Sequence, residues 1–135
     1  MKKILSVVGL ILILSVALAA CGGGGSSSSG STTISATMTD FKFDPNSWTV
    51  PANTSITLQL KNNGSVEHTW VLVNKFITPP FTSADDSDIL FSAKVEPGQS
   101  STVTFTSPST PGTYEVVCDI PGHLEAGMDG QLIVK

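Results

Sequence analysis

The stretch of sequence that decides the fold reads Cys118-Asp119-Ile120-Pro121-Gly122-His123-Leu124-Glu125-Ala126-Gly127-Met128. It holds a cysteine, a histidine and a methionine, with four residues between each neighbouring pair. The chain has one other histidine, His68, which lies fifty residues before Cys118. Taken singly, each side chain has an ordinary explanation as a core residue, a buried thiol or a solvated loop residue. Together they predict a metal site, because every histidine of the chain and one of its two cysteines would otherwise match this pattern by accident.

The donor types favour copper over other metals. Two imidazoles, a thiolate and a thioether form the ligand set of a mononuclear type 1 copper centre, which suits one-electron transfer. A structural zinc site would usually recruit more cysteines. We therefore predict one copper ion with four ligands: His68, Cys118, His123 and Met128. Pro121 and Gly122 are expected to turn the loop so that His123 returns over Cys118, and Gly127 to give Met128 room.

The N-terminus has the pattern of an exported lipoprotein. Lys2 and Lys3 precede a long apolar run, and small residues then precede Cys21, as in a secretory signal. Leu18-Ala19-Ala20-Cys21 resembles the bacterial lipobox, in which the cysteine is lipidated and becomes the mature N-terminus. We expect residues 1–20 to be a lipoprotein signal peptide, with an uncleaved signal anchor as the alternative. Either reading places the domain at the extracytoplasmic face of the bacterial cell membrane.

Composition limits the partners of the mature chain. Residues 21–33 form a tract of Gly, Ser and Thr after the lipidated Cys21, and we expect a flexible tether with a reach of roughly 20 Å. Removal of the leader leaves five lysines, no arginine and eleven acidic residues, a net charge of −6. So few cations exclude a nucleic-acid partner. Cys118 then has no cysteine partner in the domain, so we expect it to be a copper ligand, with an inert buried thiol as the alternative.

Residues 34–135 have the pattern of a single all-β domain. Apolar and polar residues alternate along several short segments, which turn sequences separate, as is typical of a β-sandwich. His68 shares its parity with Val66 and Trp70, and Cys118 shares its parity with Val116, so we expect both ligands to face the interior. Residues 74–90 are too long for a hairpin loop, and we expect a crossover between sheets or a flap over one face.

Several of these segments resemble the cupredoxins, the type 1 blue copper proteins. Pro111 to Gly130 is similar to their C-terminal copper loop, with a Cys-to-His spacing like that of azurin and a His-to-Met spacing like that of the auracyanins. His68-Thr69-Trp70-Val71-Leu72-Val73-Asn74 and the tethered N-terminus also resemble auracyanins most. The resemblance implies a Greek-key β-sandwich of about eight strands. It further implies a membrane-anchored electron carrier of a respiratory or photosynthetic chain.

The resemblance also indicates which residues surround the ligands. Glu67, Thr69 and Asp119 are expected to neighbour them, and Thr69 and Asp119 differ from the residues common in the family. An apolar surface around the edge of His123 is expected to dock partners such as a c-type cytochrome, a quinol-oxidising complex, a terminal oxidase or a photosynthetic reaction centre. That surface would consist of Ile120, Pro121, Leu124, Ala126 and Met128.

The acidic residues near this surface have two interpretations. They could steer a basic partner, or they could simply keep an exported domain soluble. They are Asp85, Asp86, Asp88, Glu125 and Asp129.

Other classes of protein fit the sequence less well. A copper enzyme of the nitrite-reductase or multicopper-oxidase kind needs a second centre, and no histidines remain to build one, so we do not expect an enzyme. A copper carrier could use the same ligands, but it would need an exchangeable site. A metal-free adhesion domain would explain the sandwich and not the four ligands.

Overall fold

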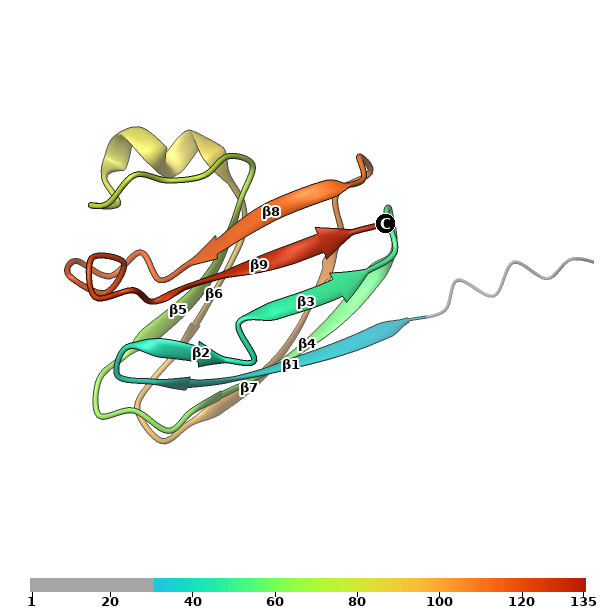
Figure 1. The fold of residues 1–135 in the computed structure, drawn as a ribbon. Helices are drawn as coiled ribbons and strands as arrows, with labels where there is room; N and C mark the ends of the chain where they lie inside the picture. The colour runs from blue at the N-terminus through green and yellow to red at the C-terminus, as the bar shows by residue number, and fades with distance from the viewer. Residues whose placement is uncertain (1–30) are drawn as a thin grey trace, which may run out of the picture.

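The computed structural model describes residues 31–135, which form two packed β-sheets (Figure 1). The strands are β1 (Thr32–Thr39), β2 (Lys42–Asp44), β3 (Ser47–Val50), β4 (Ser55–Asn62), β5 (His68–Val73), β6 (Ile89–Val95), β7 (Ser100–Thr106), β8 (Gly112–Val117) and β9 (Asp129–Val134). One sheet has the order β2-β1-β4-β7 and the other β3-β9-β8-β5-β6. The predicted all-β Greek-key sandwich is confirmed. No helix within residues 31–135 is long and apolar enough to cross a membrane.

The number of strands and the start of the domain differ from the sequence-based expectation. The described part of the chain has nine strands instead of about eight, because the chain changes sheets between β2 and β3. Pro45 lies at this change and has no N–H to continue a ladder. Thr32 and Thr33, which we assigned to the tether, begin β1 because they pair with Ile56 and Thr57 of β4. The predicted signal peptide, Cys21 and the tether up to residue 30 lie outside the described residues.

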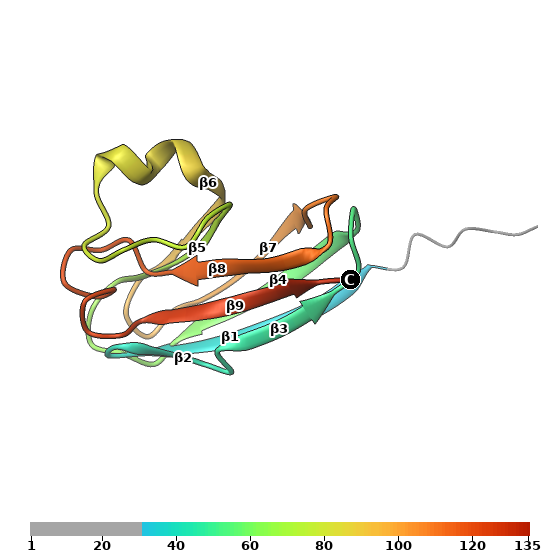
Figure 2. The ribbon, with the colours of Figure 1, turned by 45° about the horizontal axis from the view of Figure 1, so that its top comes forward.

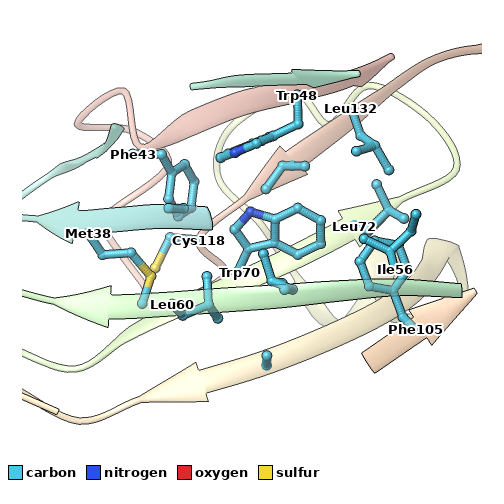
Figure 3. Close-up of a cluster of buried hydrophobic side chains, with 14 of the residues drawn as sticks. Met38, Phe43, Trp48, Ile56, Leu60, Trp70, Leu72, Phe105, Cys118 and Leu132 are labelled. Carbon is cyan, nitrogen blue, oxygen red and sulfur yellow. The ribbon is translucent and has the colours of Figure 1, made fainter. Parts of the chain in front are cut away.

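The core between the sheets is built around Trp70, which is fully buried (Figure 3). Its ring lies 5.6 Å from those of Trp48 and Phe105, measured between centroids. Trp48 also donates a hydrogen bond from Nε1 to the carbonyl of Ser35, at 2.8 Å. Cys118 lies at one end of this cluster, so the core reaches the predicted metal site. Large side chains buried in this way each contribute about 1.5–3 kcal/mol to stability.

Strand β5 is buried on both faces, because a long connection covers the outer face of its sheet. Trp70 and Leu72 face the core, whereas Val71 and Val73 pack outward against Ile77. Residues 74–88, which we call the flap, include the 3₁₀ helix η1 (Ser83–Asp88) and stand over the sheet (Figure 2). Since β5 and β6 pair antiparallel in one sheet, the flap alternative was right and the crossover alternative wrong.

A buried carboxylate ties the flap to the sheet. Glu115 on β8 is only 7% exposed, and its Oε2 accepts a hydrogen bond from the backbone N–H of Ile77 at 2.6 Å. Burial raises the pKa of Glu115 above 4.5, against the effect of the Ile77 hydrogen bond. The flap is therefore held by an apolar cluster and by one hydrogen bond to an anion that is costly to bury.

Two substitutions of Glu115 should separate the effect of the hydrogen bond on stability from the effect of the charge. Glu115→Ala leaves the buried N–H of Ile77 without an acceptor, so we expect it to lower the free energy of unfolding by about 1–3 kcal/mol. Glu115→Gln keeps an acceptor and removes the charge. Because the pKa is raised in the folded state, the wild-type carboxyl contributes most to the free energy of unfolding at pH values below 4.5, its pKa in the unfolded chain. That contribution is lost as the pH rises.

Urea denaturation at about pH 4 and about pH 7 measures both effects. We expect the Glu115→Gln variant to gain stability relative to the wild type at the higher pH. A stability difference between the wild type and this variant that does not change with pH would contradict the prediction.

Candidate metal centre

Three of the four predicted ligands converge at one end of the sandwich. The donor atoms of His68, Cys118 and His123 all lie within 4.8 Å of one another. The Nδ1 atom of His123 lies 3.2 Å from Nδ1 of His68 and 3.2 Å from Sγ of Cys118. A metal ion held at about 2.0–2.3 Å by nitrogen and sulfur ligands needs donors spaced by about 3–4 Å. The spacing therefore fits one metal ion among the three side chains.

The register of two central strands brings the distant ligands together. β5 and β8 pair antiparallel with Val71 opposite Val117, so the start of β5 lies beside the end of β8. His68 is the first residue of β5, and Cys118 follows the last residue of β8. Val66 was wrongly predicted to share the interior face, because it precedes β5 and is 40% exposed.

The turn before β5 is fixed by a buried amide. The Nδ2 group of Asn62 donates hydrogen bonds to the carbonyls of Val66, at 2.8 Å, and Val95, at 2.9 Å. Its Oδ1 accepts one from the N–H of Gly64 at 2.8 Å. Asn62 is fully buried, so its hydrogen bonds hold the segment that leads into His68.

The loop from Cys118 to Met128 is closed by its own backbone hydrogen bonds. The N–H of Met128 donates to the carbonyl of His123 at 3.0 Å, and the N–H of Cys118 donates to the carbonyl of Met128 at 3.1 Å. Gly122 and Gly127 have φ values of 88° and 90°, a region that favours glycine. Met128 is fully buried in the same core cluster as Cys118, beside the convergent donors.

The environment of Cys118 and His123 favours their neutral forms in the absence of a metal. Burial raises the pKa of the Cys118 thiol, and hydrogen bonds from Thr69 oppose that rise. Burial, followed by the nearby His68, lowers the pKa of His123. Both histidines and Cys118 are at most 7% exposed. Soft and borderline donors in a dry site fit copper, whose binding would release the thiol proton.

Thr69 and Asp119 link the two ligand segments through hydrogen bonds. The hydroxyl of Thr69 donates to Oδ1 of Asp119 at 2.6 Å and accepts from the N–H of Asp119 at 3.1 Å. The N–H of Thr69 points to Sγ of Cys118 at 3.4 Å, and the hydroxyl lies at the same distance from that sulfur. Thr69 has one hydroxyl proton, so Asp119 and the sulfur compete for it.

Glu67 is directed away from the site. Its carboxylate lies 3.0 Å from Nζ of Lys94 on β6, and this interaction lowers the pKa of Glu67. Among the hydrogen bonds of residues 31–135, none joins Glu67 to the four predicted ligands. Glu67 was predicted to neighbour the ligands, but within the described chain it makes no hydrogen bond to any of them.

Sequence reasoning missed two residues of the turn between β1 and β2. Oδ1 of Asp40 lies 2.9 Å from Nε2 of His68, and the ring of Phe41 lies 4.7 Å from that of His123. Hydrogen bonds from Ser65 and then from His68 lower the pKa of Asp40 to about 2. The only sequence signal was an acidic and an aromatic residue at the end of an alternating segment.

The apolar surface near His123 differs in part from the prediction. Pro121 and Ala126 are exposed and Ile120 is half-buried, as a docking surface requires. Leu124 was wrongly predicted to contribute, because it is 5% exposed and packs under the flap with Ile77 and Val117. Met128 is fully buried and adds no exposed surface. Phe41, at 42% exposed, adds apolar surface that the sequence did not indicate.

The acidic residues of the flap have partners of their own. Nζ of Lys75 lies 2.6 Å from the carboxylate of Asp88 and 3.6 Å from that of Asp85. Asp85 also accepts hydrogen bonds from the backbone and side chain of Thr82, which lower its pKa. These contacts give two of the flap carboxylates structural roles.

A Greek-key sandwich that brings two imidazoles, a thiol and a thioether together at one end is the arrangement of the blue-copper electron-transfer proteins. The chain belongs to the cupredoxins, since residues 9–134 match the family described as a cupredoxin-like domain.

The chain is similar to two auracyanins of Chloroflexus aurantiacus. It is 36% identical to auracyanin-B over 68% of this chain and 46% of that protein, so the match spans under half of the relative. It is 32% identical to auracyanin-A over 71% of this chain and 68% of that protein. The crystal structure of dithionite-reduced auracyanin from Roseiflexus castenholzii superposes with a TM-score of 0.66 at 31% identity, covering 78% of this chain and 99% of that one. The comparisons and the donor geometry together indicate one type 1 copper ion as the cofactor.

The link between Thr69 and Asp119 should lower the reduction potential of bound copper. The carboxylate favours the more positive oxidation state, and it withholds the Thr69 hydroxyl proton from the thiolate. We expect Asp119→Thr to raise the potential by tens of millivolts, since a tenfold change in relative affinity is about 59 mV for one electron. Asp119→Asn, which keeps an acceptor, should shift the potential less. Equal or lower potentials in voltammetry of the variants would contradict this expectation.

Proposed function

We propose that this chain is a membrane-anchored type 1 blue-copper electron carrier, cycling between Cu(II) and Cu(I). The observation that carries the proposal is the convergence of one thiol and two imidazoles within 4.8 Å in a buried site. In this assignment His68, Cys118, His123 and Met128 would hold the copper ion, with two imidazoles, one thiolate and one thioether as donors. Copper supplies the one-electron redox chemistry, whereas the protein supplies a dry site of fixed geometry.

The rigidity of the site supports an electron-transfer role. His68 and Cys118 are attached to the two central strands of a sheet, and hydrogen bonds within the loop fix His123. Thr69 joins the two ligand segments through Asp119. Ligands held in this way move little when the charge of the metal changes, which favours rapid electron transfer.

The exposed residues around His123 are proposed as the docking surface. Pro121, Ala126 and Phe41 are exposed and Ile120 is half-buried, and the ring of Phe41 packs against that of His123. A small apolar surface suits brief contacts, which a shuttle needs for fast release. The partners proposed for it are a c-type cytochrome, a quinol-oxidising complex, a terminal oxidase or a photosynthetic reaction centre.

The place where the described chain begins is consistent with this use. β1 begins at Thr32, at the pole opposite the copper loop, and it ends beside Asp40 at the metal site (Figure 1). An eight-residue strand spans about 26 Å. Lipidation at Cys21 would then hold the domain at the extracytoplasmic face of the membrane, with the docking surface at the far end from the tether.

Copper transport is the competing function, because a carrier of copper could use the same ligands. Reversible redox cycling with retained metal separates the two functions. A copper enzyme would need further metal ligands, and residues 31–135 contain no other cluster of candidate ligands of this kind.

An optical spectrum with Cu(II), before and after ascorbate, tests the proposal directly. We expect an intense visible thiolate-to-copper band that disappears on reduction and returns on oxidation. Cys118→Ser should abolish the band, because it removes the thiolate. Asp86→Asn, on the exposed surface of η1, should leave the band unchanged. A faint spectrum with copper lost on reduction would instead support copper transport.

The docking surface can be tested by a substitution that leaves the ligands intact. We expect Ala126→Gln to slow electron transfer to a c-type cytochrome by roughly fivefold to tenfold, the effect of about 1 kcal/mol of lost contact. Ser109→Gln, in the exposed loop before β8 at the opposite pole, is the matched control. Stopped-flow kinetics measures both variants, and their optical spectra should match the wild type. Equal transfer rates for the two variants would place docking elsewhere.

A further inference from the structure

We propose that Asp40 is a positioning residue for His68, and that its carboxylate charge lowers the reduction potential of the bound copper. The inference rests on the proposed blue-copper function and deepens it. Asp40 lies in the turn after β1, twenty-eight residues before His68. It is not one of the four predicted ligands, and it acts through one of them.

The two nitrogens of His68 have different partners. Nε2 lies 2.9 Å from Oδ1 of Asp40, whereas Nδ1 lies 3.2 Å from Nδ1 of His123 and faces the metal site. The side chain of His68 has no exposed surface, so water does not compete for Nε2. With the proton on Nε2 and donated to the carboxylate, the lone pair of Nδ1 is left for the metal. Asp40 therefore selects the tautomer that can bind copper.

Asp40 is itself held in place, as a positioning residue must be. Its Oδ2 accepts a hydrogen bond from the N–H of Ser65 at 2.9 Å and another from the Ser65 hydroxyl. Gly64 makes the approach possible, because a Cβ atom there would lie 2.3 Å from Oδ1 of Asp40 and 2.7 Å from Nε2 of His68. Any other residue at position 64 would push the carboxylate and the imidazole apart.

The charge of the carboxylate also bears on the metal. The Asp40 side chain is 28% exposed, so solvent screens it only in part. A negative charge bonded to a ligand stabilises Cu(II) more than Cu(I), because Cu(II) carries the larger charge. The result is a lower reduction potential than the four ligands alone would give.

Two substitutions separate position from charge. Asp40→Asn can still accept the hydrogen bond from Nε2 but has no charge, so we expect a higher potential with a near-normal blue spectrum. A tenfold loss of affinity confined to Cu(II) corresponds to a rise of about 59 mV. Asp40→Ala removes both the charge and the acceptor, and we expect a further fall in Cu(II) affinity, about 10- to 100-fold below the wild type. Voltammetry and competition with a Cu(II) chelator measure these quantities.

Two further variants serve as controls. Asp86→Asn makes the same change of charge on the exposed surface of η1, and it should leave the potential unchanged. Ser65→Ala alters an exposed residue and only loosens the hold on Asp40, so it should shift the potential in the same direction as Asp40→Asn by a smaller amount. If the Asp40 variants do not fold, the potential of the Ser65→Ala variant still tests the proposal.

A measurement without copper tests the tautomer itself. Nitrogen NMR of the metal-free protein should show His68 protonated at Nε2 in the wild type and in a mixture of tautomers in Asp40→Ala. Wild-type potentials in all three variants at positions 40 and 65, with the His68 tautomer unchanged, would overturn the inference. A wild-type protein with no blue band would contradict the proposed function instead, and the tautomer measurement would then decide the role of Asp40 alone.

Discussion

The antiparallel pairing of β5 with β8 is the constraint on which the rest of the site depends. It places Val71 opposite Val117, and by extension sets Thr69 beside Asp119 and the start of β5 beside Cys118. A shift of this register by one residue would turn the side chains of one strand to the opposite face, and either Trp70 or Cys118 would then leave the core between the sheets. The pairing is protected because β5 and the last three residues of β8 are buried on both faces, one by the second sheet and one by the flap. Apolar packing therefore determines where the metal ligands lie.

Around this fixed pair, the remaining parts of the site come from turns that are held by specific hydrogen bonds. The ligand loop is closed by its own backbone, and the turn into His68 is closed by the buried side chain of Asn62. The turn after β1 contributes Asp40 and Phe41, which contact the two imidazoles from outside the ligand set. Each turn depends on polar groups that are satisfied inside the protein, which keeps the donors close together whether or not a metal is bound.

The ligand set and the fold class were predictable because both follow from local patterns in the sequence. The spacing from Cys118 to Met128 and the alternation along β1 and β4 need no knowledge of distant contacts. The contact of Asp40 with His68 and the burial of Leu124 were not predictable in this way. Asp40 reaches His68 only because β1 and the turn before β5 meet at one end of the sandwich, and Leu124 is buried only because the flap folds back over β8. Contacts of this kind depend on tertiary structure, and the local pattern of a single sequence does not specify them.

The shared cluster of Leu124, Ile77, Val71 and Val117 links the ligand loop to the flap as a single packed unit. The ligand loop lies between β8 and β9 and contains three of the four predicted ligands in one segment, so it would be a convenient unit to graft onto another scaffold. In this chain such a graft would remove the side chain that fills the space beneath residues 74–88. A transplanted loop without an apolar residue directly after its histidine would leave a cavity under the flap. Loop and flap therefore form one module for engineering, and they need to be exchanged together.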